Sequence, residues 1–199
     1  MKLYLSPGAC SLADHIALHE AGIDFQRIRV DLKAKRTEDD RDYTQVNPKG
    51  YVPALELDDG DILTENIAIL SWIADQAPML APDGAMGRYR LLEMLAFIST
   101  EVHKGFKPFF SPTAPEEKQK AAETLDKRFR YIVGQLKGDF LFGSRFSVAD
   151  AYLFTMLTWA KKNVLPLPPA LNDYFERVKA RPAVQLALEH EGLAQAKAA

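Results

Sequence analysis

The segment VPALELDDGDILTENIAILSWIADQA, residues 52–77, decides the fold class of the first half of the chain. Two short apolar runs, 54–57 and 62–64, flank an Asp-Asp-Gly turn, and this pattern is a strong signal for a β-hairpin. Residues 65–77 then repeat apolar side chains at helical spacing. The segment therefore predicts two paired strands followed by a helix.

The residues before this segment extend the same α/β pattern. Gly22 follows an apolar stretch in the position that ends a helix, and a polar, charged loop occupies 32–41. The expected elements are strands at 2–5 and 25–30, a helix at 11–21 and a short helix at 41–46. The predicted order for the first domain, residues 1–78, is βαβαββα.

The composition changes at about residue 80. Beyond a Pro-Asp-Gly linker no convincing strand follows, and prolines punctuate a series of helical patterns. The expected helices are 87–107, 115–137, 147–164, 170–180 and 182–193. The sequence thus predicts an α/β domain at 1–78 and an all-helical domain at 86–199.

The overall composition is that of a folded globular protein. Hydrophobic residues make up 47% and charged residues 26% of 199 residues, and the net charge is −2. A near-neutral chain gives no general argument for nucleic-acid binding. No apolar run reaches membrane-spanning length, and the apolar stretch before Pro7 is too short for a signal peptide. We expect a cytoplasmic protein with no nucleic-acid or membrane partner.

The cysteine and histidine content argues against a metal site. A single cysteine, Cys10, excludes an intramolecular disulfide and a cysteine-rich zinc site. His15 and His19 have an i, i+4 spacing that can bind zinc, but no HExxH motif accompanies them, and the four histidines are dispersed. The sequence predicts ordinary helix-surface histidines and no metal.

Several motifs in order resemble one enzyme family. The βαβαββα half with Val52-Pro53 before its hairpin resembles a thioredoxin-like domain, in which this proline is cis. The added helical half resembles the glutathione transferases. The motifs similar to the bacterial beta class are SPGACS (6–11), NPKGYVPAL (47–55), LTE (63–65), EVHKGF (101–106) and FSVAD (146–150). The resemblance covers nearly the whole chain.

This resemblance implies a detoxifying homodimer that conjugates the glutathione thiolate to small hydrophobic electrophiles. Glutathione would be a co-substrate, and no other cofactor is expected. Two alternatives use the same fold: a glutathione-dependent thiol–disulfide oxidoreductase that employs Cys10, and a non-enzymatic module that binds hydrophobic ligands or partners.

Cys10 and Ser11 stand at a strand-to-helix junction. Free N–H groups at a helix N-terminus favour a thiolate, although a lone cysteine is also a common buried apolar residue. No second cysteine follows at the spacing of a redox pair, so a mixed disulfide with glutathione is the remaining redox chemistry. For Ser11 we favour a helix-capping role over donation to a sulfur. The resemblance implies catalytic roles for both.

The resemblance assigns six residues of the first domain to the glutathione site, namely Cys10, Lys35, Val52, Pro53, Glu65 and Asn66. The backbone of Val52, beside cis Pro53, would pair with the cysteinyl unit. Glu65 and Asn66 open the helix whose N-terminus suits the γ-glutamyl carboxylate, with the Glu65 side chain placed to meet a cation. Asn66 departs from the small residue often found there.

Lys35 is matched by the resemblance to a lysine that holds the glycyl carboxylate. Lys33 and Arg36 are close competitors in the same loop, and a charged loop residue is often only solvated. The sequence alone does not decide which of these three side chains holds the carboxylate, or whether Lys35 is only solvated.

In the second domain a helical stripe carries polar side chains, namely Ala96, Thr100, His103, Lys104 and Lys107. His103 could hydrogen-bond a sulfur or move a proton, whereas a solvated face is the alternative reading. The resemblance implies that Thr100, Glu101 and His103 contact glutathione, Glu101 from the other subunit. Ala96 replaces the family's usual asparagine.

Two further features complete the prediction. Ser147 and Asp150 have the spacing of a helix capping box, which we interpret as structural. The aromatic residues between 106 and 110 could border the site of the hydrophobic second substrate.

Overall fold

The computed structural model describes residues 1–194 as two compact units. The first unit combines Met1–Pro78 with the chain from Ala180 onward, and the second is Met79–Lys179. The sequence predicts 86–199 as one helical domain, whereas the segment after Lys179 belongs with the first unit. The final residues of that predicted domain, 195–199, lie outside the described part.

The first unit is built on a five-stranded mixed sheet with the order β3-β2-β1-β4-β5. The central strand β1 pairs parallel with β2 and antiparallel with β4, and β4 forms the predicted hairpin with β5. The strands are β1 (Lys2–Leu5), β2 (Gln26–Asp31), β3 (Arg36–Thr37), β4 (Ala54–Glu56) and β5 (Ile62–Thr64). The short edge strand β3 lies in the segment predicted as loop and was missed.

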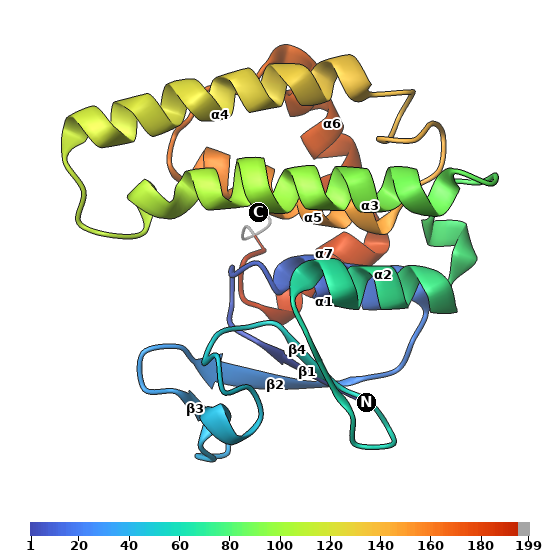
Figure 1. Ribbon diagram of the computed structural model, residues 1–199, viewed down its shortest axis with the longest axis vertical. Helices are drawn as coiled ribbons and strands as arrows, with labels where there is room; N and C mark the ends of the chain where they lie inside the picture. Colours follow the sequence, from blue (N-terminus) through green and yellow to red (C-terminus); the bar gives the residue numbers. More distant parts are fainter. Residues whose placement is uncertain (195–199) are drawn as a thin grey trace, which may run out of the picture. The chain divides into compact units, whose positions relative to one another are not determined.

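Helices α1 (Leu12–Ala21) and α2 (Asn66–Gln76) lie side by side on one face of this sheet (Figure 1). Helix α7 (Pro182–His190) packs against α1, and Arg181 forms a bidentate ion pair with Glu20 at 2.6 and 2.7 Å. Because the sheet, α2 and α7 surround α1, its residues from Leu12 to Leu18 are buried. The prediction of a helix-surface position is therefore wrong for His15, which is completely buried.

The connection from β3 to β4 folds over the sheet. It contains a short 3₁₀ helix, η1 (Tyr43–Gln45), and the side chains of Tyr43 and Val52 join Tyr4 and Val30 in a small core. The Val52–Pro53 peptide bond is cis, as predicted. This core places the backbone of Val52 at the start of the hairpin.

The second unit is entirely helical over its described elements, which confirms the predicted fold class. Its helices are α3 (Gly87–Phe97), α4 (Pro115–Gln135), α5 (Val148–Lys162) and α6 (Pro169–Lys179), preceded by the short η2 (Pro78–Leu80). Almost every side chain from Val148 to Leu157 is buried, so α5 forms the centre of this unit. None of the described helices combines the length and apolar composition needed to cross a bilayer.

The predicted single helix 87–107 is wrong in its second half. After α3 the chain continues as a π-helical segment, η3 (Ile98–His103), and then as a 3₁₀ segment, η4 (Lys104–Phe109). Pro108 has no N–H for an α-helical bond. At Gly105 a Cβ atom would lie 2.9 Å from a terminal methyl carbon of Leu125 of α4, so a larger residue there would require this leucine side chain to shift.

Candidate functional site

Cys10 lies between β1 and α1 and is partly exposed. Its thiol donates a hydrogen bond to the carbonyl oxygen of Val52, with 3.4 Å between Sγ and O. The structure thus brings together two residues that the sequence assigned to one site. This contact requires a protonated thiol.

Burial raises the pKa of the Cys10 thiol to about 12, and the negative charge of Asp14 acts in the same direction. The backbone N–H groups of Cys10 and Ser11 oppose this shift, as expected at a helix start, but they do not outweigh desolvation. In the free protein, burial therefore outweighs the preference for a thiolate that the helix N-terminus creates. Sequence reasoning considered the helix end and could not know the depth of burial.

Ser11 occupies the N-cap position of α1, but its side chain makes no capping bond. Its backbone is already helical, with φ −58° and ψ −16°. The buried hydroxyl instead accepts from the N–H of Ser6 at 3.3 Å and donates to the Ser6 carbonyl at 3.5 Å. The predicted cap is wrong, and Ser11 closes the turn that carries Cys10.

The backbone of Val52 is held in place by its neighbours. The carbonyl of Tyr51 accepts hydrogen bonds from the Tyr43 hydroxyl at 3.0 Å and the Asn47 amide at 2.7 Å. Within residues 1–194, the N–H of Val52 has no hydrogen-bond partner, because strand pairing begins only at Ala54. A fixed and unpaired N–H is suited to bind an extended peptide.

Among the three cations of the preceding loop, Lys35 is the one directed to this segment. Its Nζ donates to the carbonyl of Gly50 at 2.6 Å, and its side chain packs at 3.4 Å from the position of a Gly50 Cβ. Arg36 instead pairs with Asp40, and Lys33 is exposed. The structure therefore favours Lys35 over the two competitors left open by the sequence.

Glu65 precedes α2 with an unusual backbone conformation, φ 76° and ψ 126°. A positive φ at a non-glycine residue costs of the order of 1–3 kcal/mol and is typical of functional positions. The carboxylate pairs with Lys49 and accepts from the Tyr51 hydroxyl at 2.7 Å. Sequence reasoning expected Glu65 to meet a cation but did not assign a role to Lys49 or Tyr51, although both lie in the quoted NPKGYVPAL motif.

Asn66 connects the start of α2 to the cysteine. Its side-chain amide donates to the carbonyl of Cys10 at 3.0 Å, and the residue is buried. The amide is therefore used inside the protein, whereas the first N–H groups of α2 have no acceptor within the helix. Binding of the γ-glutamyl carboxylate by these N–H groups remains a prediction.

His103 belongs to the second unit, where its Nδ1 lies 2.7 Å from the Tyr152 hydroxyl and its ring meets Trp159 edge-on at 4.9 Å. Burial, assisted by Lys104, lowers the pKa of His103 to about 4. The imidazole is neutral at physiological pH, and Nε2 has no hydrogen-bond partner among the described residues. It is equipped to exchange a hydrogen bond, not to supply a positive charge.

The predicted polar stripe divides into two environments. Ala96, Thr100, Lys104 and Lys107 are exposed, and the Thr100 hydroxyl donates to the carbonyl of Ala96 at 3.0 Å. His103 instead turns toward Tyr152. The solvated-face reading thus describes most of the stripe.

The carboxylate of Glu101 forms an ion pair with Arg128 of its own chain at 2.7 Å. The roles of Thr100, Glu101 and His103 toward glutathione remain predictions.

Comparisons with known proteins agree with this architecture. The glutathione S-transferase N-terminal domain model matches residues 9–76, and the C-terminal domain model matches residues 97–182. The glutathione S-transferase GstA of Escherichia coli O157:H7 is 48% identical over 97% of this chain and 100% of its own.

Two solved structures are similar over almost their full length. A sphingomonad glutathione S-transferase complexed with glutathione has a TM-score of 0.89 and 49% identity, covering 98% of this chain and 100% of that one. A beta-class glutathione S-transferase of Sphingomonas chungbukensis has a TM-score of 0.89 and 46% identity at the same coverage. With both family domains present in order, the chain belongs to the glutathione S-transferase family, and it resembles the bacterial beta class.

Proposed function

We propose that this protein is a glutathione transferase that conjugates the glutathione thiolate to small hydrophobic electrophiles. The observation that carries the proposal is the unpaired N–H of Val52 beside Cys10, in a chain that matches both family domains. A peptide thiol bound there would lie next to the one cysteine of the chain. The relatives named above supply the reaction class.

Each functional group of glutathione has a matching group in the first unit. The cysteinyl backbone pairs with Val52 beside Pro53, and the γ-glutamyl carboxylate takes the free N–H groups at the start of α2. Glu65 meets the γ-glutamyl ammonium, and Lys35 meets the glycyl carboxylate. Lys49 and Tyr51 hold the Glu65 carboxylate in position through the contacts described above.

The sulfur chemistry requires a thiolate on glutathione, not on Cys10. The N–H groups of Cys10 and Ser11 favour negative charge at this position, and the resemblance assigns a further hydrogen bond to the bound thiolate to His103. Lowering a thiol pKa by about two units takes roughly 2.7 kcal/mol of preferential stabilisation, which such groups can supply together. The attacking electron pair comes from glutathione, so Cys10 need not form a covalent bond in the conjugation.

The second unit would hold the electrophile. Phe106, Phe110 and Trp159 contact one another edge to face or tilted, with Phe110 and Trp159 centroids 4.7 Å apart. Phe110 keeps 57% of its surface exposed, which makes an apolar contact available to a small hydrophobic molecule.

We also expect a homodimer in which Glu101 reaches the partner's glutathione. A fully active monomer at micromolar concentration would overturn both parts of this expectation.

The decisive experiment compares two neighbouring lysines. Lys35→Gln should raise the KM for glutathione about 10-fold or more with an aromatic halide as electrophile, because a charge-assisted bond to a carboxylate contributes about 1.5–3 kcal/mol. The matched control Lys33→Gln should leave both KM and kcat unchanged. Equal effects of the two variants would contradict the assignment of the glycyl carboxylate.

The same assays separate the alternatives. A thiol–disulfide oxidoreductase would act faster on a glutathionylated disulfide than on the halide, but the raised pKa of Cys10 opposes attack by this thiol. A non-enzymatic module would show no turnover of either substrate. Absence of conjugation together with retention on immobilised glutathione would support the binding module and overturn the proposed reaction.

A further inference from the structure

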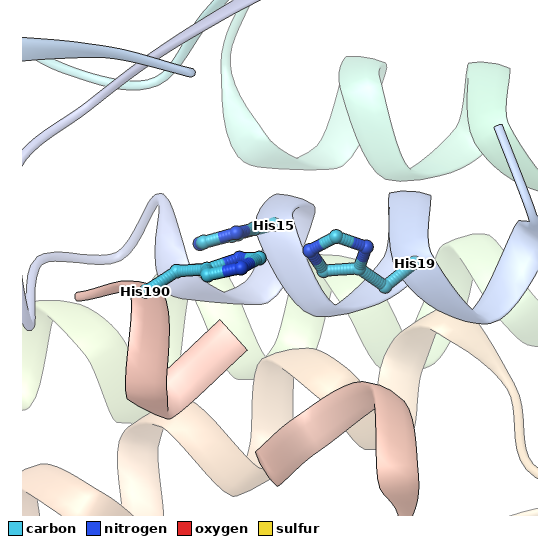
Figure 2. Close-up of side chains that lie close together, drawn as sticks. All are labelled: His15, His19 and His190. Carbon is cyan, nitrogen blue, oxygen red and sulfur yellow. The ribbon is translucent and has the colours of Figure 1, made fainter. Parts of the chain in front are cut away.

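Three of the four histidines gather where α7 packs on α1. His15 and His19 lie one helical turn apart on α1, and His190 is the last residue of α7. One ring nitrogen from each approaches the others within 4.8 Å, and Figure 2 shows the three imidazoles grouped between the two helices. The sequence could not predict this cluster, because His190 is far from the other two along the chain.

Among residues 1–194, each of the three rings contains a buried nitrogen atom without a hydrogen-bond partner: Nε2 of His15, Nε2 of His19 and Nδ1 of His190. His15 is completely buried. Buried polar atoms are nearly always hydrogen-bonded, so three orphaned nitrogens in one cluster require an explanation. A cation bound by their lone pairs would satisfy all three.

A carboxylate fixes the orientation of the central ring. Nδ1 of His15 lies 2.8 Å from Oε1 of Glu191, whose other oxygen accepts the N–H of Gly8 at 2.8 Å. With Nδ1–H donating to the carboxylate, Nε2 of His15 carries the free lone pair. A carboxylate behind a histidine in this way is the usual outer support of a metal ligand.

The other two rings are partly exposed and can be reached from solvent. A hollow of about 460 Å³, lined in part by His19, Phe25 and His190, opens to this cluster. Neutral imidazoles are ligands for transition metals, and the hollow gives an ion access. Arg27, which also lines the hollow, opposes a cation.

We propose that His15, His19 and His190 bind one divalent transition-metal ion of the Zn²⁺ type and thereby join α7 to α1. Zn–N bonds of about 2.0–2.1 Å in a tetrahedral site require nitrogen atoms about 3.3 Å apart. Rotation of the partly exposed His19 and His190 rings closes the remaining distance, while His15 stays on Glu191. Water completes the coordination from the hollow. The site uses no residue that we assign to glutathione.

The test is a Zn²⁺ titration of chelator-treated protein in competition with a chromophoric chelator. One equivalent should bind with a micromolar or tighter Kd, and His19→Gln and His190→Gln should each weaken it by about 10-fold or more. Arg27→Gln should strengthen binding several-fold, because it removes an opposing charge. His15→Gln is not used, since loss of its buried pair with Glu191 would also disturb folding.

Controls separate this site from the other candidate ligands. His103→Gln removes the fourth histidine and Cys10→Ser removes the thiol, and neither should change the affinity for Zn²⁺. Saturating Zn²⁺ should raise the Tm of the wild-type protein by several degrees but leave that of His190→Gln unchanged. Bound Co²⁺ should give the visible absorption of a low-symmetry imidazole site.

Two outcomes would overturn the proposal: no Zn²⁺ binding below millimolar concentration, or binding that is equally tight in both His19→Gln and His190→Gln. Conjugation of glutathione should be unaffected in these two variants. A failure of the metal site is therefore distinguishable from a failure of the proposed transferase activity.

Discussion

The first turns of α1 and α5 each contain a completely buried aspartate, but the two carboxyl groups have opposite surroundings. Asp150 in α5 accepts four hydrogen bonds, from the N–H groups of Leu141 and Ser147 and from the hydroxyls of Ser147 and Tyr174. Within the described part of the chain, neither oxygen of Asp14 in α1 has a hydrogen-bond partner. Burial raises the pKa of both groups. Four hydrogen bonds oppose this shift for Asp150, whereas only its own backbone N–H opposes it for Asp14.

The two aspartates therefore affect the stability of the fold in different ways. Asp150 joins the start of α5 to the preceding loop and to α6, so its burial is offset by bonds that hold the second unit together. No such hydrogen bonds offset the cost of burying the Asp14 carboxyl group in the described part of the chain. This group raises the pKa of the Cys10 thiol one turn earlier, so the charge state of the cysteine is coupled to an acid that the fold leaves unsatisfied.

The largest expected effect is that of Asp150→Ala. It leaves four donors without an acceptor in the core, and we expect the free energy of unfolding to fall by about 3–5 kcal/mol. Chemical denaturation followed by circular dichroism measures this change. Asp126→Ala is the control, because this acid forms an i, i+4 ion pair with Arg130 on the surface and should cost no more than about 0.5 kcal/mol. Comparable losses in the two variants would contradict the structural role of Asp150.

The role of Asp150 shows how far local sequence patterns reach. The spacing of Ser147 and Asp150 predicts the capping box, because both partners lie within one helical turn. The bond from Tyr174 depends on the packing of α6 against α5, which no local pattern specifies. The same limit applies to the candidate site. The sequence motifs identified Cys10 and Val52. The contact of Asn66 with Cys10 and the ion pair of Glu65 with Lys49 could be seen only in the tertiary structure.

A smaller effect, of opposite sign, is expected for Asp14→Ala. Removal of two buried and unpartnered oxygens should raise the free energy of unfolding at neutral pH by about 1–3 kcal/mol. The pH dependence identifies the cause. The folded pKa of Asp14 is raised above its unfolded value near 3.9, so the stability it contributes at low pH is lost as pH rises toward the folded pKa.

Asp14→Asn is the matched variant for this prediction, because it keeps the size of the side chain and removes the ionisation. Relative to the wild-type protein it should become progressively more stable as the pH rises from about 4 to the raised folded pKa of Asp14, and the difference should then stay level, as measured by denaturation at each pH. A constant difference across this range would show that Asp14 is already ionised in the folded protein.

Burial also determines two protonation states that the sequence left open. A helix N-terminus is visible in a sequence and favours a thiolate at Cys10, but the desolvation that opposes it depends on the whole surrounding unit. The stripe around His103 is visible as well, but the interpretation as a solvated face does not predict that its half-buried imidazole pairs with Tyr152. Residue type and spacing thus identified Cys10 and His103 as candidate functional residues, but the protonation states of their side chains depend on packing.

The smallest expected effect concerns the reactivity of Cys10 itself. With a pKa of about 12, the wild-type thiol should react with iodoacetamide at pH 8 far more slowly than a free thiol, whose pKa is near 8.5. Asp14→Asn removes the second cause of the raised pKa and leaves the first, which is burial, unchanged. The rate should therefore rise only a few-fold, less than the tenfold that one pKa unit represents.

Mass spectrometry of the alkylated protein measures this rate, and Cys10→Ala gives the background, since the chain has no other thiol. A rate in the wild-type protein equal to that of a free thiol would show that burial does not control Cys10. An unchanged rate in Asp14→Asn would show that the two groups are not coupled, and the contrast between the two buried aspartates would then concern stability alone.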